Sequence, residues 1–410
     1  MDVEIRAIQP AELPEIGRVF GTVFGEPWPS ESVDDLRRVF EFDRSLCGFD
    51  GGAMVATGGA FSFDLTVPGG GQLGAGGLTL VSVLPTHRRR GILRAMIGRH
   101  FEDVLGRGEA ASILTASESL LYGRFGYGIA TRQAQLLIDR RNAALRPPPA
   151  PTGRVRMLGD EEALRVLPGI FERVRRALPG QVSRSRAWWE MWLHDPAWLR
   201  DGWSRHVLVV HEPPGGEPDG YAGYRQRAQW SDGLPEGVVR VDELLAETPQ
   251  AATGLWGYCL DLDLTATVEV RDRPLDEPLH WLLVDPRRLR TTMVADFLWL
   301  RLLDLPAALR ARRYATAGRL VLEVADPLVP ANHGRFVLDG GPDGAACQPA
   351  GQAEPDVVLD VAELAAAYLG GVRFATLARA SRIREGRPGG LERADAMFAT
   401  DRMPWCSTPF

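Results

Sequence analysis

Residues 81–94 read Val-Ser-Val-Leu-Pro-Thr-His-Arg-Arg-Arg-Gly-Ile-Leu-Arg, so a β-type run passes through a short turn into the start of a helix. The first backbone N–H groups of a helix have no acceptor within it, and the helix dipole adds positive potential at that end. Gly91 removes a side chain at the point of closest approach, and the neighbouring arginines add charge. The stretch therefore suits a bound pyrophosphate, although a solvated basic cluster at a helix start has the same composition.

The sequence on either side predicts an α/β unit around this turn. Residues 12–24 and 91–105 repeat apolar side chains at helical spacing, and β-type runs stand before, between and after them. Residues 69–74 match Gly-x-Gly-x-x-Gly, but they join two β-type runs and open no helix, so we interpret them as a hairpin. The expected strands cover residues 3–8, 53–58, 60–67, 77–83, 110–116 and 136–139.

The rest of the chain divides into two further segments. A proline-rich stretch at 146–153 predicts a stiff linker. Beyond it, residues 154–284 alternate strands and helices in a similar order, which suggests an internal duplication, but residues 247–252 replace the basic turn and hold no such anion motif. From about residue 285 the pattern indicates a small α+β unit with antiparallel strands at 307–314, 318–324 and 334–339. Five tryptophans of the second segment have partly helical spacing typical of a core or an interface: Trp188, Trp189, Trp192, Trp198 and Trp203. The alternative is that one of them lines the acceptor cleft.

Composition restricts the function classes. A chain of 410 residues exceeds the size at which one hydrophobic core stops growing, so two or three domains are expected. No stretch approaches the roughly 20 apolar residues that span a bilayer, and the acidic start lacks a signal peptide's basic and apolar regions, so we expect a cytoplasmic protein. The net charge of −6 argues against nucleic acid and favours cationic ligands. Four scattered cysteines predict neither disulfides nor a metal site: Cys47, Cys259, Cys347 and Cys406.

Residues 81–94 resemble the acetyl-CoA motif of the GNAT superfamily of N-acetyltransferases, and in particular the form V-x-V-x-P-T-H-R-R-R-G-x-L-R of the Eis (enhanced intracellular survival) family. Arg94 stands where many GNAT proteins have a small residue, and the Eis-type motif shares this arginine. The resemblance implies acetyl-CoA as co-substrate, with the Val83 amide facing the thioester oxygen as an oxyanion donor. It implies Val81, Ser82 and Val83 along the acyl-pantetheine arm, and Arg89, Arg90, Gly91, Ile92, Leu93 and Arg94 at the pyrophosphate.

A second motif is similar to the same superfamily. Residues 122–127 read Tyr-Gly-Arg-Phe-Gly-Tyr, where GNAT proteins typically show Tyr-x-x-x-Gly-Phe. The resemblance implies Tyr122 as the acid that protonates the departing CoA thiolate, with Ser117 and Glu118 near the co-substrate. A phenol near pKa 10 that donates to a thiolate near 8.5 works uphill by roughly 2 kcal/mol, which is small beside what positioning contributes. Without residues 81–94, Tyr122 would be interpreted as a half-buried packing tyrosine.

The chain ends on Phe410, as the Eis family does, and the resemblance implies that its free α-carboxylate is the catalytic base. Because an α-carboxyl has a pKa of about 3.5 and an amine about 10, direct deprotonation of an ammonium would cost on the order of 9 kcal/mol. We therefore expect this carboxylate to anchor a cationic substrate and to relay a proton through water. The alternative is a docked hydrophobic tail.

The acceptor is expected near the end of the first helix, where GNAT acceptor sites are usually built. Phe24, Glu26 and Trp28 place two aromatic rings around a carboxylate, which suits a polyamine. A plain surface loop fits these three residues equally well.

Together these features predict an α/β and α+β multidomain protein with two tandem GNAT-type mixed-sheet domains and a C-terminal sterol-carrier-protein-like α+β domain. We assign residues 1–150 to the catalytic domain, 151–285 to a GNAT-like domain without the CoA motif, and 286–410 to the domain that delivers the terminal carboxylate. The expected activity is N-acetylation of primary amines on polycationic small molecules, aminoglycosides above all, by direct attack in a ternary complex. Protein lysine acetylation and a non-catalytic CoA- or lipid-binding module are the alternatives. The family also implies a homo-hexamer, and no metal, nucleic-acid or membrane partner is expected.

Overall fold

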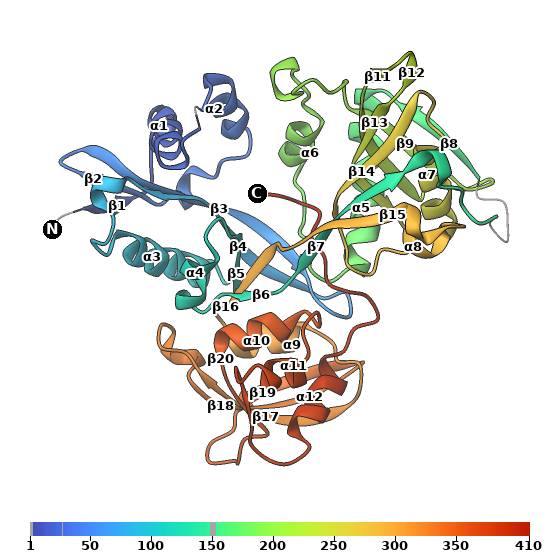
Figure 1. The fold of residues 1–410 in the computed structure, drawn as a ribbon. Coiled ribbons are helices and arrows are strands. Elements are labelled where there is room, and N and C mark those ends of the chain that lie inside the picture. The colour runs from blue at the N-terminus through green and yellow to red at the C-terminus, as the bar shows by residue number, and fades with distance from the viewer. Residues whose placement is uncertain (1–2, 27, 148–152) are drawn as a thin grey trace. The chain divides into compact units, whose positions relative to one another are not determined.

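The computed structural model describes residues 3–26, 28–147 and 153–410. The chain forms two compact units, one built from Met1–Thr131 with Phe297–Phe410 and the other from Arg132–Asp296 (Figure 1). The first unit therefore contains both ends of the chain, and the second is inserted between them.

A seven-stranded mixed sheet forms the centre of the first unit. Its strand order is β1-β2-β3-β4-β5-β16-β6, and β4 and β5 are its one parallel pair among the described residues. The two glycine-rich turn positions with left-handed backbone, Gly69 and Gly70, join β3 to β4, which confirms the hairpin interpretation. The strands are β1 (Glu4–Arg6), β2 (Cys47–Asp50), β3 (Ala53–Thr66), β4 (Gln72–Val83), β5 (Ala111–Thr115), β6 (Gly128–Ile129) and β16 (Leu298–Leu302).

Strand β3 is continuous where two strands, 53–58 and 60–67, were expected. Glycines inside a strand usually weaken it, but here they admit neighbouring side chains. A Cβ at Gly58 would lie 2.9 Å from the Met96 side chain, and one at Gly59 would lie 3.1 Å from the ring of Phe40. The glycines therefore allow close packing on the sheet rather than ending the strand.

The helices of this sheet follow the predicted apolar periodicity. Helix α1 (Leu13–Phe24) buries Leu13, Ile16 and Val19, and helix α3 (Ile92–Gly106) buries an apolar face against the sheet. Burial of such a stripe is what stabilises a helix that propensity alone leaves marginal. Two short helices complete this part, α2 (Ser30–Arg37) and α4 (Ser119–Tyr122).

The sheets exchange strands across the predicted segment limits. The strand expected at 136–139 forms within β7 (Arg132–Asp139), but it pairs with β14 and β15 in the second sheet, so it does not complete the first unit as predicted. In its place β16 returns from beyond the second unit and lies between β5 and β6. A β-type run shows that a strand forms but not which strand pairs with it. The predicted linker at 146–153 falls mostly outside the described residues.

The second unit repeats the local order of the first. Its parallel pair β13–β14 is joined by helix α7 (Pro249–Leu260), as β4 and β5 are joined by α3. The sheet order is β15-β7-β14-β13-β10-β9-β8. The strands are β8 (Arg154–Leu158), β9 (Val207–Glu212), β10 (Gly220–Arg227), β13 (Gly237–Ala246), β14 (Thr265–Arg273) and β15 (Leu289–Asp296), with the ribbon β11 (Trp230–Ser231) and β12 (Leu234–Pro235). The other helices are α5 (Asp160–Ala177), α6 (Arg186–Leu193) and α8 (Leu279–Leu282).

The last part of the chain is a five-stranded sheet with four helices, and it belongs to the first unit. A buried ion pair joins it to the first sheet, since Arg301 on β16 contacts Asp326 at 2.7 Å. The strands are β17 (Gly318–Ala325), β18 (Gly334–Gly341), β19 (Gly344–Pro349), β20 (Val357–Asp360) and β21 (Arg384–Glu385). The helices are α9 (Leu305–Ala311), α10 (Val361–Tyr368), α11 (Phe374–Arg379) and α12 (Gly390–Phe398). The strands expected at 318–324 and 334–339 are confirmed as the antiparallel pair β17–β18. The strand expected at 307–314 is wrong, because most of that range lies in helix α9.

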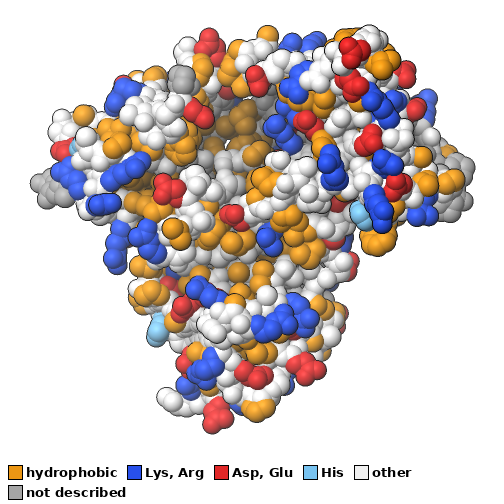
Figure 2. All heavy atoms as spheres, in the orientation of Figure 1, with side chains coloured by type: hydrophobic (Ala, Val, Ile, Leu, Met, Phe, Trp, Pro, Cys, Tyr) orange, Lys and Arg blue, Asp and Glu red, His pale blue; other side chains and the backbone are white. Residues whose placement is uncertain are grey.

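Charged side chains of both signs are interspersed on the face drawn in Figure 2. Many exposed arginines contact a carboxylate, as Arg18 does with Glu15 at 2.7 Å and Arg186 with Glu190 at 2.8 Å. Exposed pairs of this kind contribute little to stability, but they neutralise the guanidinium groups locally. Exposed arginines that lack a carboxylate partner among the described residues, such as Arg89 and Arg94, therefore differ from most others on this surface.

Candidate active site

A bulge interrupts β4 where the predicted co-substrate motif begins. The register with β3 shifts between Thr57 and Gly59, and Leu80 takes a left-handed backbone with φ of 56°. The buried Thr57 hydroxyl holds this shape, since it donates to the Leu80 carbonyl at 2.7 Å and lies 2.6 Å from Ser82 Oγ. Ser82 therefore has its side chain committed to the bulge, and only its backbone is available to a ligand. Thr57 was not predicted, because a threonine inside a strand carries no signal of such a role.

Beyond the bulge, β4 separates from β5. The two strands pair only over Ala75–Gly77, while β4 continues to Val83. The Leu84 N–H donates to the Val55 carbonyl at 2.9 Å, so Leu84 faces β3. Because hydrogen-bonded and non-hydrogen-bonded residues alternate along an antiparallel pair, the Val83 N–H points away from β3 toward the open side. That orientation fits the predicted oxyanion donor.

The turn after β4 leads into α3 with its N-terminal N–H groups uncapped. Gly91 is the N-cap residue and offers no side chain, and the first intrahelical hydrogen bond runs from the Ala95 N–H to the Gly91 carbonyl at 3.1 Å. Arg89 and Gly91 both have left-handed backbone, with φ of 61° and 81°. A Cβ at Gly91 would meet no protein atom within 4 Å, so the protein needs glycine here for its backbone conformation and not for space.

The arginines at this helix start are exposed and only partly paired. Arg90 lies 3.7 Å from Asp50, and Arg88 Nε donates to the Val83 carbonyl at 3.4 Å. Within the described ranges, Arg89 and Arg94 have no carboxylate partner. The Ile92 side chain is buried in the core, so this residue contributes only its backbone to the site. The combination of free N–H groups and unpaired guanidinium groups fits a pyrophosphate.

Asp50 is a site residue that the sequence analysis missed. It ends β2, and its carboxylate lies 3.2 Å from His87 Nε2 as well as near Arg90. The contact spans residues distant in sequence, so only pairing of β2 with β3 brings Asp50 to this turn. Asp50 therefore orients the two basic side chains that follow β4.

In the second unit, the equivalent turn leads into a helix, α7, whose N-terminus is capped by a side chain. There the Thr248 hydroxyl accepts from the Ala251 N–H at 3.1 Å and donates to Asp219 at 2.7 Å, while Pro249 occupies the first helical position. A capped helix start beside a carboxylate repels an anion instead of binding it. The absence of CoA from the second unit stays a prediction.

Tyr122 ends the short helix α4 and is only 6% exposed. Its ring packs edge-on against Tyr127 with centroids 5.9 Å apart. Burial, followed by the charge of Glu118, raises the pKa of Tyr122 to about 12. The phenol therefore stays protonated at physiological pH and has a proton to donate. The exposed Ser117 and Glu118 form the connection from β5 to α4.

A buried hydrogen-bond chain lies beneath Tyr122. His100 Nε2 on α3 lies 2.7 Å from Ser112 Oγ on β5, and that hydroxyl lies 2.7 Å from the Tyr127 phenol. Burial, and then the nearby charge of Arg44, lower the pKa of His100 to about 3. The chain therefore links helix, strand and tyrosine through a neutral imidazole.

This imidazole makes a testable contribution to acid stability. A histidine in the unfolded chain has a pKa near 6.5, so it is protonated below that pH. His100 in the folded protein is protonated only below about pH 3, so between these values the unfolded state binds one more proton than the folded state. As the pH is lowered from about 6.5 to about 3, the free energy of unfolding should therefore fall by up to about 1.4 kcal/mol per pH unit. We expect His100→Gln to remove this slope in pH-dependent chemical denaturation. The exposed His280→Gln serves as the control, and equal slopes for wild type and His100→Gln would contradict the assignment.

Phe410 lies against the first sheet, which the C-terminal segment reaches after leaving the last domain (Figure 1). Its ring centroid lies 4.9 Å from that of Phe63 on β3, and a Cβ at Gly77 would come within 3.1 Å of it. The Thr115 hydroxyl at the end of β5 donates to the Phe410 carboxyl oxygen at 3.4 Å. The terminal carboxylate is thus fixed at the end of β5, which has already diverged from β4.

The predicted acceptor residues lie around the end of α1. Phe24 stacks on Phe20 with centroids 4.1 Å apart, and Trp28 packs on Phe20 from the next loop at 5.2 Å. An open groove of about 520 Å³ runs along α1, lined by Pro14, Gly17, Arg18, Gly21, Thr22, Gly25, Glu26 and Trp28. The structure brings Glu26 and Trp28 into one groove but leaves Phe24 outside its lining, and neither Tyr122 nor Phe410 lines it.

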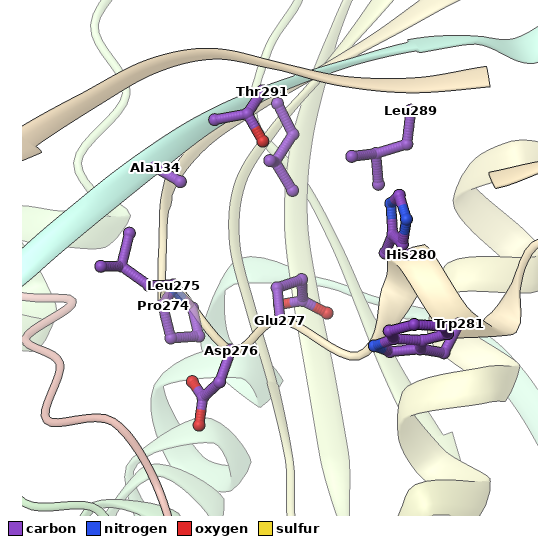
Figure 3. Close-up of a pocket in the computed structure, with 10 residues that line it drawn as sticks. Ala134, Pro274, Leu275, Asp276, Glu277, His280, Trp281, Leu289 and Thr291 are labelled. Carbon is purple, nitrogen blue, oxygen red and sulfur yellow. The ribbon is translucent and has the colours of Figure 1, made fainter. Parts of the chain in front are cut away.

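A second hollow of about 320 Å³ lies in the inserted unit (Figure 3). Two carboxylates line it, Asp276 and Glu277, and Glu277 already accepts from Arg273 Nε at 2.7 Å and from Trp256 Nε1 at 3.2 Å. It contains none of the predicted site residues, and the labelled Trp281 and His280 stand at its rim on α8. Because Glu277 already accepts these hydrogen bonds, we interpret its role in this hollow as structural.

Two features are absent from the described residues. None of their helices is long and apolar enough to cross a membrane. In the same part of the chain, no group of three or more His, Cys, Asp or Glu side chains could hold a metal ion.

Comparison with known proteins agrees with this geometry. Residues 4–130 and 180–302 each match an acetyltransferase (GNAT) domain, and residues 305–407 match a sterol carrier protein domain. The protein is thus an N-acetyltransferase with two GNAT domains and a sterol-carrier-protein-like domain. The predicted fold class is confirmed.

Whole-chain relatives identify the family. An uncharacterized N-acetyltransferase of Streptomyces avermitilis is 41% identical, covering 95% of this chain and 94% of its own. The N-acetyltransferase Eis of Mycobacterium tuberculosis is 37% identical over 87% of this chain and 89% of its own. The crystal structure of Eis1 from Mycobacterium abscessus superposes with a TM-score of 0.86 at 36% identity, covering 99% of this chain and 100% of that one. The chain belongs to the Eis family of GNAT N-acetyltransferases.

Proposed function

We propose that this enzyme transfers the acetyl group of acetyl-CoA to a primary amine on a polycationic small molecule, with aminoglycosides as the favoured class. The observation that carries the proposal is the Thr115 hydrogen bond to the Phe410 carboxyl oxygen at 3.4 Å. It holds an anion beside the diverging ends of β4 and β5, where an ammonium would approach a thioester held by β4. A terminal carboxylate in that position has a role beyond packing.

The proposed reaction is direct attack in a ternary complex. The amine nitrogen attacks the thioester carbonyl carbon, and the oxygen that gains negative charge accepts from the Val83 N–H. The C–S bond then breaks, and the departing thiolate takes a proton from the Tyr122 hydroxyl. The proton that the amine loses passes through water to the Phe410 carboxylate. The Phe410 carboxyl then releases that proton to water and the Tyr122 phenolate regains one from water, so both groups return to their starting states. No covalent enzyme intermediate forms.

The co-substrate would be held by its pyrophosphate. The uncapped N–H groups at the start of α3, together with Arg89 and Arg94, would bind the phosphates. The backbone of Val81–Val83 would contact the acyl-pantetheine arm, as the Eis-type motif implies. Ser117 and Glu118 would border the same arm from the turn after β5.

The preference for a polycation rests on charge. The chain has a net charge of −6, and the α1 groove combines the Glu26 carboxylate with the Trp28 ring. A carboxylate beside an aromatic face attracts ammonium groups by charge and by cation–π contact. We carry the homo-hexamer and the cytoplasmic location over from the family resemblance and the sequence as part of this proposal.

An acceptor panel tests the proposal. With aminoglycosides, polyamines and lysine peptides, we expect acetyl-CoA-dependent release of CoA thiol with the polycationic small molecules. Glu26→Gln should raise KM for those amines several-fold without changing KM for acetyl-CoA, whereas the exposed Glu102→Gln should change neither. The chain contains no lysine, so acetyl-lysine cannot form on the enzyme itself and confuse the assay.

Each other outcome of this panel identifies a different function. Thiol release with lysine peptides alone would indicate a protein acetyltransferase. Tight binding of acetyl-CoA with no release for any amine would indicate a non-catalytic module and overturn the proposal.

A further inference from the structure

We propose that Arg312, Gly370 and Gly371 are positioning residues for the terminal carboxylate. They form a seat in the last domain that fixes the start of the C-terminal segment, residues 399–410, and so determine where Phe410 ends. The inference rests on the proposed function in one respect, namely that the Phe410 carboxylate acts on the amine.

Arg312 binds the ends of two helices. Its guanidinium is fully buried and contacts no carboxylate within the described ranges. Instead its nitrogens donate to the Tyr368 carbonyl at the end of α10 and to the Phe398 carbonyl at the end of α12, the latter at 3.2 Å. The carboxyl ends of helices carry partial negative charge, so a buried cation there is compensated by the two dipoles. Residue 398 is the last of α12, and the C-terminal segment leaves from this point.

Gly370 and Gly371 receive the segment next. A Cβ at Gly370 would lie 2.5 Å from the Thr400 side chain, and Gly370 itself has φ of 89°. A Cβ at Gly371 would lie 2.7 Å from Cγ of Pro404. Both distances are shorter than real Cβ contacts, so any larger residue must displace the segment.

The seat is tied to the first sheet. Helix α10, which ends just before Gly370, packs so closely on β6 that a Cβ at Gly128 would lie 2.0 Å from the Ala362 carbonyl oxygen. Beyond Pro404 the segment is buried at Trp405, Cys406 and Thr408 before Phe410 meets β3. A displacement at Pro404 is therefore passed along a short, packed segment to the terminal carboxylate.

The test is Gly371→Ala. Because the Pro404 ring cannot bend away as a flexible side chain would, the added methyl group must move the segment. We expect kcat to fall about 10-fold or more, with KM for acetyl-CoA unchanged, and amide hydrogen exchange to rise in the peptide covering 399–410. The matched control is Gly159→Ala in the inserted unit, where a Cβ meets no atom within 4 Å and φ is −82°.

A second variant separates positioning from loss of fold. Pro404→Ala removes the ring atoms that the Gly371→Ala methyl group would meet, so the double variant should recover much of the lost kcat. In an enzyme extended beyond Phe410, Gly371→Ala should cause no further loss, since both changes act on the same carboxylate.

The failures can be told apart. Unchanged kcat and unchanged exchange in Gly371→Ala, with activity still abolished by C-terminal extension, would overturn the seat and leave the proposed function standing. Raised exchange with unchanged kcat, in an enzyme that tolerates extension, would show that the carboxylate itself is not used. A fall in kcat without raised exchange, or without recovery in the double variant, would also overturn the positioning role.

Discussion

Extending the chain by two glycines after Phe410 is expected to lower kcat by about 10²- to 10³-fold and to leave acetyl-CoA binding unchanged. Two added residues move the carboxylate by about 7 Å and put a neutral peptide group in its place. The Thr115 hydroxyl would then face an amide carbonyl, and the ammonium would lose both its anchor and its proton acceptor. Steady-state kinetics with the best amine, and calorimetric titration with acetyl-CoA, measure the two quantities.

The matched control keeps the carboxylate and removes the ring. Phe410→Leu still ends on a carboxylate at the same chain position but loses the contact with Phe63. Its loss of kcat should be much smaller than that of the extended enzyme. If extension leaves kcat unchanged, or if Phe410→Leu is equally inactive, the ring and not the carboxylate is what matters, and a docked hydrophobic tail becomes the correct description.

Replacement of Tyr122 by phenylalanine is expected to lower kcat by about 10²-fold or more with little change in KM for acetyl-CoA. The phenol hydroxyl has no hydrogen-bond partner within the described ranges, and the ring stays packed on Tyr127. The variant should therefore fold with unchanged stability and lose only the proton donor. Tyr127→Phe, which breaks the contact with Ser112 but touches no substrate in the proposed mechanism, is the matched control.

The raised pKa of Tyr122, about 12, bears on this prediction. Transfer of its proton to a thiolate near 8.5 would be uphill by roughly 5 kcal/mol, more than for an unperturbed phenol. Burial destabilises a thiolate as well, since it raises the pKa of the Cys47 thiol to about 11. A CoA thiolate formed in buried surroundings would therefore have a raised pKa too, which makes the difference in pKa between Tyr122 and the thiol smaller. Activity should show no loss from Tyr122 ionisation below about pH 11. Full activity of Tyr122→Phe would remove it as the acid.

Much of the first domain could be predicted from local sequence. Helices α1 and α3, the hairpin at Gly69–Gly70 and the helix start at Gly91 each depend on residues within a few positions of one another. Periodicity and backbone preference are local properties, so a single sequence contains them. The roles of Val83, Tyr122, Phe410 and the other site residues are predictions that the variants above test.

Tertiary structure alone decided which distant segments meet. The pairing of β7 with the second sheet and of β16 with the first depends on packing of strands far apart in the chain. Thr57 at the bulge, Asp50 at the basic turn and Arg312 at the helix ends act through partners that no spacing rule connects. The sequence by itself determined the family and the motif at 81–94, since those depend on adjacent residues. The position of the last carboxylate required the fold, because it depends on contacts of Phe410 with Phe63 and Thr115, which lie about 300 residues or more earlier in the chain.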